Sequence, residues 1–201
     1  MIVRDEEANI SKCLSSVAGL FDEIVVVDTG STDRTREIAR EFGARVFDFV
    51  WVNDFAAARN AALARAKGDY AFWLDADDVL DPPQRAKLQA LLDGLRAGDE
   101  AAYVVRCSCD PGPNGDGGQT VVDHIRLFPV REGVRWTYAV HEQILPALRR
   151  ANVPVRWTEV TVRHTGYTDP ALRERKLQRD CKILESELAE NSGQWPVVSG
   201  Q

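Results

Sequence analysis

Three aspartates follow a short apolar run in the middle of the chain, at Asp75, Asp77 and Asp78. The run, residues 70–74, is rich in aromatic side chains and is typical of a buried strand in a mostly parallel sheet. Ligands of open α/β sheets bind beyond the carboxyl ends of the strands, where this run places Asp75 and Asp77. Side chains two residues apart on an extended chain point the same way, so these carboxylates can converge on one cation. The alternative is that they only cap the following helix, for which Asp78 or Asp81 would suffice.

The strand that ends in these aspartates is the fourth in a regular alternation of strands and helices across residues 1–78. The runs that predict the first three strands are Ile2-Val3, Ile24 to Val27 and Val46 to Phe49. Apolar residues at helical spacing predict a helix after each of them. Such alternation builds a parallel sheet with right-handed crossovers, so the sequence predicts an α/β fold.

The second half of the chain does not continue the alternation of strands and helices. Strands are predicted at residues 102–107, 121–128, 134–136, 155–157 and 160–164. We interpret them as an antiparallel or mixed extension of the first sheet. A proline after Asp169 begins a final helix, and its apolar face is predicted to consist of Leu177, Cys181, Leu184 and Leu188.

The composition of the chain argues against several classes of function. The 201 residues carry a formal net charge of −6 without a block of lysines and arginines. This argues against a nucleic-acid scaffold but not against a nucleotide held through a metal ion. The four cysteines show neither zinc-site nor disulfide spacing, so we expect reduced thiols and a cytoplasmic location. No apolar run is long enough to span a bilayer, and no signal peptide is recognisable.

Four short motifs occur in an order that resembles the family 2 glycosyltransferases of GT-A fold. They are Val3-Arg4-Asp5-Glu6-Glu7, Val27-Asp28-Thr29-Gly30-Ser31-Thr32-Asp33, Ala58-Arg59-Asn60 and Leu74-Asp75-Ala76-Asp77. The chain is most similar to members that are linked to tetratricopeptide repeats or that resemble lipopolysaccharide-core glucosyltransferases. The resemblance is strong over residues 1–80 and looser as far as His164, and it is specific for the family but not for the substrate.

The resemblance implies a single GT-A domain over residues 1–168, followed by a C-terminal helix and tail at 169–201. Residues 1–80 would be its nucleotide-binding half and 99–168 its acceptor-side half. The implied activity is inverting hexosyl transfer that uses Mn²⁺ or Mg²⁺ and a nucleotide-diphosphate donor, expected to be a UDP-sugar. The acceptor would be a hydroxyl group of a saccharide, a lipid-linked molecule or a protein, and a continuation into helical repeats is implied as well.

The resemblance also implies roles for individual residues. Asp28 would bind the base or ribose, and Arg59 would bind the nucleotide or its diphosphate, although an exposed helix-face arginine is an open alternative. Asp75 would contact the ribose or the metal, and Asp77 would ligate the metal. His164 would be the third metal ligand, a role that suits Mn²⁺ better than Mg²⁺.

An inverting transfer also needs a base that deprotonates the acceptor hydroxyl. Glu142 is the candidate that the resemblance implies, with His141 as the second choice. The open alternative is a surface glutamate paired with Arg149 or Arg150.

Two rival functions make different demands on the sequence. A nucleotidyltransferase of similar topology usually has a glycine-rich phosphate loop after its first strand, where this chain has Arg4-Asp5-Glu6-Glu7. A non-catalytic GT-A module that serves as an interaction platform would lack nucleotide affinity. If the chain is a transferase, the glycine-rich stretch 112–118 and the helix that begins at Pro170 are expected to border the acceptor.

Overall fold

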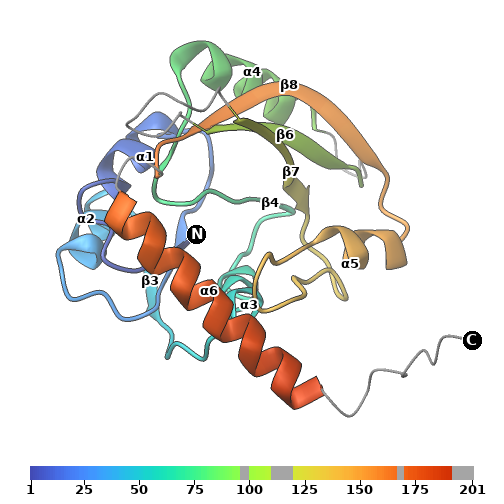
Figure 1. The fold of residues 1–201 in the computed structure, drawn as a ribbon. Helices are drawn as coiled ribbons and strands as arrows, with labels where there is room; N and C mark the ends of the chain where they lie inside the picture. The colour runs from blue at the N-terminus through green and yellow to red at the C-terminus, as the bar shows by residue number, and fades with distance from the viewer. Residues whose placement is uncertain (96–99, 110–119, 167–169, 192–201) are drawn as a thin grey trace, which may run out of the picture.

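The computed structural model describes residues 1–95, 100–109, 120–166 and 170–191. The chain builds two sheets that are flanked by helices (Figure 1). The stretch 112–118, which was expected to border the acceptor, lies outside the described residues. No helix in the described part of the chain is both long and apolar enough to cross a membrane.

The first sheet is parallel, in the order β1-β2-β3. Its strands are β1 (Ile2–Val3), β2 (Val25–Asp28) and β3 (Arg45–Asp48). They are connected by the helices α1 (Ile10–Ser16) and α2 (Thr35–Glu41). One buried cluster joins both helices to the sheet through Ile10, Val26 and Ala39. The predicted alternation of strands and helices is confirmed for this part of the chain.

The second sheet has five strands in the order β4-β7-β6-β8-β5. Their bounds are Tyr70–Phe72 for β4, Asp78–Val79 for β5, Ala102–Cys109 for β6, Thr120–Pro129 for β7 and Val155–His164 for β8. Strands β6 and β8 are parallel, and the other neighbours are antiparallel. The second half therefore forms a mixed sheet, as expected, but this sheet is separate from the first and takes two strands from the first half.

The run that ends in the three aspartates is not one parallel strand, which corrects the prediction. Strand β4 stops at Phe72 and pairs with β7, and the chain becomes extended again as β5 at the opposite edge of the same sheet. A turn causes the interruption. The Asp78 N–H donates to the Asp75 carbonyl at 3.1 Å, and the Asp78 carboxylate accepts from the Asp75 N–H at 2.8 Å. Asp75 and Asp77 therefore lie between two edge strands, and Asp78 is the first residue of the second strand.

A shared core holds the two sheets together. Helix α4 (Pro82–Gly94) packs on β8, and its buried Leu88 joins a cluster with Val105 of β6 and Val160 of β8. Cys13 of α1 belongs to the same cluster. A cavity of about 180 Å³ remains where residues of β1, β2 and β4 face one another. The sheets thus share one core, although their described strands do not pair with each other.

The segment around residues 134–136 is a loop rather than the expected strand. The side chain of Asn60, on α3 (Phe55–Leu63), takes up both backbone groups of Trp136 that a strand neighbour would use. The Trp136 N–H donates to Asn60 Oδ1 at 2.8 Å, and Asn60 Nδ2 donates to the Trp136 carbonyl at 3.0 Å. A short helix that was not predicted, α5 (Leu145–Arg150), follows the loop. The runs 155–157 and 160–164 belong to the single strand β8.

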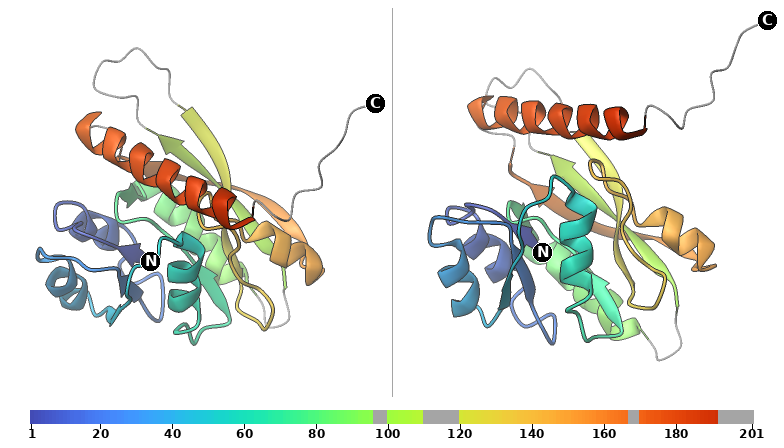
Figure 2. Two further views of the ribbon diagram at one scale, coloured as in Figure 1. Left: turned by 60° about the horizontal axis from the view of Figure 1, so that its bottom comes forward. Right: turned by 90° about the horizontal axis from the view of Figure 1, so that it is seen from below.

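Helix α6 (Pro170–Asn191) crosses in front of α3 in Figure 1 and lies along one side of the molecule in Figure 2. The predicted helix is confirmed, but its apolar face does not pack on the body of the protein. Its members Leu177, Cys181, Leu184 and Leu188 are all exposed. Ile183 is the buried residue instead, and it packs against Ala139 and Val140. Polar groups of the helix also face inward: Arg179 lies 4.7 Å from the ring centroid of Phe55, and Glu187 accepts a backbone N–H.

Candidate functional site

The turn between β4 and β5 places three neighbouring carboxylates in three different environments. Asp78 is completely buried, and its Oδ2 lies 2.6 Å from Nη1 of the equally buried Arg126. Asp75 is partly buried, and its Oδ1 lies 2.9 Å from Nη2 of Arg59. Asp77 is also buried, and burial raises its pKa above the ordinary value. Asp78 therefore has its charge neutralised inside the protein, while Asp75 and Asp77 lie nearer the surface of the turn.

His164 ends β8 directly opposite Asp78, the first residue of β5. Its Nδ1 lies 3.0 Å from Oδ1 of Asp78 and 3.3 Å from Oδ1 of Asp77. Burial alone would lower the pKa of His164, but the hydrogen bond with Asp78 and the charge of Asp77 outweigh burial and raise it. The distant residue that was expected to complete a metal site thus does return to the aspartates.

Asp75, Asp77 and His164 can direct their ligand atoms at one point, since these atoms lie within 4.8 Å of one another. Two carboxylates and an imidazole suit Mn²⁺, and carboxylate oxygens also suit Mg²⁺. Gly166 lies so close that a Cβ at this position would collide with Oδ2 of Asp77. The donor set and the lack of a side chain at Gly166 therefore fit a divalent metal ion.

The close approach of Gly166 gives a prediction for this site. Gly166→Ala is expected to weaken Mn²⁺ binding in the presence of UDP by about tenfold, because the added methyl group displaces Asp77 from its partners. Calorimetric titration measures the change. Gly94→Ala is the control, because a Cβ at Gly94 meets open space. Equal Mn²⁺ affinity in the two variants would contradict the close fit.

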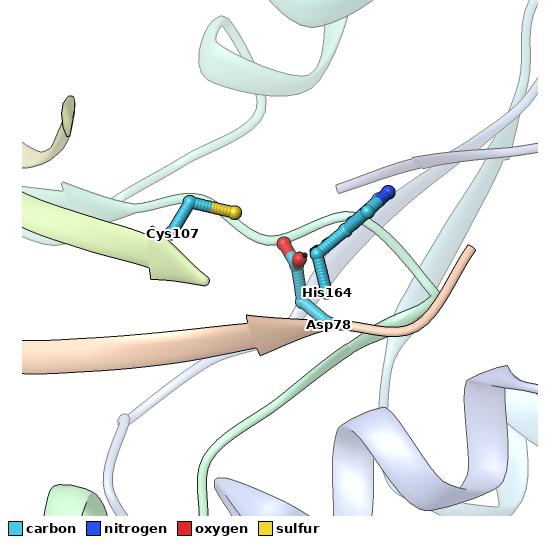
Figure 3. Close-up of side chains that lie close together, drawn as sticks. All are labelled: Asp78, Cys107 and His164. Atoms are coloured by element: carbon cyan, nitrogen blue, oxygen red, sulfur yellow. Dashed lines mark hydrogen bonds and ion pairs between the residues drawn. The ribbon is translucent and has the colours of Figure 1, made fainter. Parts of the chain in front are cut away.

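A second trio of possible ligands, Asp78, Cys107 and His164, lies on the inner side of the same turn. In Figure 3 the Asp78 carboxylate lies between the Cys107 thiol and the His164 ring. The guanidinium of Arg126 already occupies this environment, with Nη2 at 3.5 Å from Cys107 Sγ. Burial raises the pKa of Cys107 to about 12, so the thiol remains protonated. A buried cation and a protonated thiol both disfavour metal binding, which leaves the outer trio as the candidate metal site.

Arg59 connects the aspartate turn to Glu142. Its Nε lies 2.5 Å from Oε1 of Glu142, and its Nη2 donates to Asp75 Oδ1. The Arg59 side chain is 8% exposed and lies 4.3 Å and 5.2 Å from the ring centroids of Trp73 and Trp136. Burial would raise the pKa of Asp75, but Arg59 holds it well below the ordinary range. Arg59 is thus not an exposed helix-face arginine, and the arginine that pairs with Glu142 is a buried one.

The loop that carries Glu142 is held in shape by its backbone. Thr137 and Gln143 form an antiparallel bridge, with N···O distances of 3.0 Å and 2.9 Å. Between them, Tyr138 and His141 have φ angles of 71° and 55°, which are unfavourable for residues other than glycine. Both side chains are exposed, so His141 does not share the partly buried position of Glu142. The fold therefore fixes the position of Glu142 and leaves the side chains of Tyr138 and His141 exposed to solvent.

Asp28 ends β2 and organises the loop that follows. Its Oδ1 accepts the N–H groups of Gly30 at 3.0 Å and Ser31 at 2.9 Å. Its Oδ2 is buried and has no hydrogen-bond partner in the described part of the chain. At the start of α2 the Thr35 N–H donates to Asp33, at 2.9 Å, and not to Asp28. Asp28 is thus free of the capping role and keeps one acceptor for another partner.

Three neighbours of the aspartates were not predicted from the sequence: Arg126, Cys107 and Lys176. The position of Arg126 could have indicated this contact, because it interrupts the apolar residues Ile125, Leu127 and Phe128 and a charge at such a position needs a buried partner. The contact of Lys176 could not be predicted, because nothing in the sequence pattern of α6 shows which lysine faces the body of the protein.

Comparisons with known proteins agree with this geometry. The model of the family "Glycosyl transferase family 2" matches residues 1–156. A TPR repeat-containing protein of Synechococcus elongatus is 37% identical over 199 residues, which are 95% of this chain and 47% of that protein. The glycosyltransferase SunS of Bacillus subtilis is 29% identical over 192 residues, which are 94% of this chain and 44% of SunS. The chain thus spans less than half the length of these two relatives.

Two solved structures share the fold at low sequence identity. Glucosyl-3-phosphoglycerate synthase of Mycobacterium tuberculosis, solved with Mn²⁺ and UDP-glucose, has a TM-score of 0.59 and 19% identity, with 94% of this chain and 76% of that chain covered. TarS of S. aureus, residues 1–349 in complex with UDP, has a TM-score of 0.57 and 17% identity, with 91% and 63% covered. The chain therefore has the GT-A fold and belongs to glycosyltransferase family 2.

Proposed function

We propose that this chain is a metal-dependent, inverting glycosyltransferase that moves a hexose from a UDP-sugar to a hydroxyl acceptor. The observation that carries the proposal is the convergence of Asp75, Asp77 and His164 within 4.8 Å of one another. The structural neighbour that was solved with Mn²⁺ and UDP-glucose supports the choice of metal and donor. Membership of the family supports the choice of reaction.

On the donor side, four residues of this chain would hold the nucleotide and its metal. Asp28 would accept a hydrogen bond from the nucleoside through Oδ2, which has no partner among the described residues. Asp75, Asp77 and His164 would hold the metal. A bound divalent ion offsets the negative charge that develops on the β-phosphate as the sugar C1 leaves it. Because Asp28 ends a strand of the first sheet and His164 ends a strand of the second, the donor would bridge the two sheets.

On the acceptor side, Glu142 would take the proton from the attacking hydroxyl. Arg59 holds Glu142 by its Oε1 and Asp75 by its Oδ1, so one guanidinium sets the distance between the base and the metal side of the site. The two tryptophan rings beside Arg59 limit the movement of this guanidinium. Arg59 is therefore proposed to position Asp75 and Glu142, in addition to attracting the diphosphate.

Titration of UDP tests the proposal directly. Wild-type protein is expected to bind UDP at least about tenfold more tightly with Mn²⁺ than without it, and Asp77→Asn is expected to lose most of this gain because a metal ligand loses its charge. Asp69→Asn makes the same chemical change at an exposed aspartate and serves as the control.

Two results would count against the proposal. UDP binding that is independent of metal and unchanged by Asp77→Asn would exclude the metal assignment. A lack of UDP binding under all conditions would favour another nucleotide or a non-catalytic module. The continuation into helical repeats, the cytoplasmic location and the division of the chain at residue 168 stay predictions.

A further inference from the structure

Helix α6 brings a positive charge to the candidate metal site. Nζ of Lys176 lies 3.7 Å from Oδ2 of Asp77, while His164 lies beside Oδ1 of the same carboxylate. Asp75 and Asp78 have arginine partners of their own. Each aspartate of the turn therefore has its own cation from the protein, and Lys176 is the cation that faces Asp77.

Lys176 is the most easily displaced of these three cations. The Lys176 side chain is 32% exposed, whereas those of Arg59 and Arg126 are 8% and 2% exposed. Its ion pair is also longer than the pairs of Arg59 with Asp75 and Arg126 with Asp78, at 3.7 Å against 2.9 Å and 2.6 Å. Water screens a pair of this kind more strongly than a buried one. Lys176 is thus the cation that a divalent ion at Asp77 would displace most readily.

The rest of α6 keeps this lysine close to the site. Ile183 is buried against Ala139 and Val140, and Glu187 accepts the Ala139 N–H at 3.3 Å. A lysine displaced from Asp77 therefore stays within a side-chain length of the place where the metal and a diphosphate would lie. The diphosphate is the natural new partner, because it is an anion and would be bound to the same metal.

We propose that Lys176 is a built-in counter-ion of Asp77, which a divalent metal ion must displace and which then binds the diphosphate of the donor. This inference rests on the proposed function. Without nucleotide, the ammonium and the metal ion repel each other, so the metal binds weakly. With nucleotide, the ammonium gains the diphosphate as a partner, so metal and nucleotide strengthen each other's binding. Lys176 thereby disfavours binding of the metal alone.

The test is a titration of Mn²⁺ alone, followed by Mn²⁺ in the presence of UDP. Lys176→Gln is expected to bind Mn²⁺ alone about tenfold more tightly than wild type, because a like charge next to the metal is removed. UDP should then strengthen Mn²⁺ binding less in this variant than in wild type. Lys182→Gln, the same change at an exposed lysine of the same helix, should match wild type in both titrations. Lys176→Arg keeps the charge and should also remain close to wild type.

The outcomes separate this inference from the proposed function. If wild type binds UDP in a Mn²⁺-dependent way but Lys176→Gln has the Mn²⁺ affinity of Lys182→Gln, only the counter-ion inference is overturned. If wild type binds no UDP with Mn²⁺, the proposed function fails, while tighter binding of Mn²⁺ alone by Lys176→Gln would still support the pairing of Lys176 with the metal site. Thermal melting without ligands checks that the variants fold, and weaker Mn²⁺ binding by a folded Lys176→Gln would overturn the inference.

Discussion

Glu142→Gln is expected to lower kcat for sugar transfer by about a hundred- to ten-thousandfold, because the acceptor hydroxyl loses its proposed base. The affinity for UDP should stay close to that of wild type. Glutamine keeps the shape of the side chain and an oxygen that can accept from Arg59 Nε, which lies 2.5 Å from Oε1 in the wild-type protein. The change therefore removes the proton acceptor with little disturbance of the contact that positions it. Transfer from a UDP-sugar and UDP titration, measured on the same preparation, separate the two effects.

A matched control and an alternative base accompany this prediction. Glu132→Gln makes the same change at an exposed glutamate and should leave kcat unaltered. If Glu142→Gln retains full transfer, Glu142 is not the base, and His141→Ala becomes the next variant to assay. Loss of UDP affinity together with kcat would instead show that Glu142 acts through the Arg59 and Asp75 contacts on the donor side.

Arg126→Met is expected to lower the free energy of unfolding by about 3–5 kcal/mol, because it leaves the charge of Asp78 buried without its cation. The pair is 2.6 Å apart, and both side chains are almost completely inaccessible to water. Asp78 also closes the turn that carries Asp75 and Asp77, so the damage should extend to the metal site. Urea denaturation measures the loss of stability.

The single variant Asp78→Asn and the double variant Arg126→Met/Asp78→Asn complete a thermodynamic cycle. The double variant should be more stable than Arg126→Met alone, because it no longer buries an uncompensated carboxylate. Arg106→Met, on the neighbouring strand β6, is the control. Its partner Glu159 lies 3.8 Å away and both side chains are largely exposed, so the expected loss is below about 1 kcal/mol. A similar loss in Arg126→Met and Arg106→Met would contradict the structural role of the buried pair.

The parts of the fold that were predicted correctly depend on local pattern. Residues 1–48 alternate between β-branched runs and helical stripes, and the strands and helices that these patterns predict are the ones that form. The run at 70–78 was misread because its local pattern is that of one strand. The N–H of Asp75 instead donates a hydrogen bond to the side chain of Asp78, which interrupts the strand. The two parts of the run, β4 and β5, pair with β7 and β8, which come much later in the sequence.

The candidate site was foreseen in its members but not in its contacts. The ordered motifs indicated Asp28, Arg59, Asp75 and Asp77, and the structure places the last three within one connected group with His164 and Glu142. The contact between Arg59 and Glu142 joins residues that are 83 positions apart in the sequence. Hydrophobic periodicity is a local pattern and cannot predict such a contact. The face of α6 that packs on the protein could not be predicted either. Charged contacts such as that of Lys176 with Asp77 orient the helix, rather than its leucines.

The loop from Thr137 to Gln143 combines a fixed backbone with an exposed side chain. Its shape depends on the backbone hydrogen bonds between Thr137 and Gln143 and on the hydrogen bond from Trp136 to Asn60. It does not depend on the ring of Tyr138, which is 60% exposed. An exchange at Tyr138 for another residue that tolerates a positive φ would therefore leave Glu142 in place. Variants at such solvent-facing positions can therefore be screened for other acceptors without moving Glu142, the proposed base.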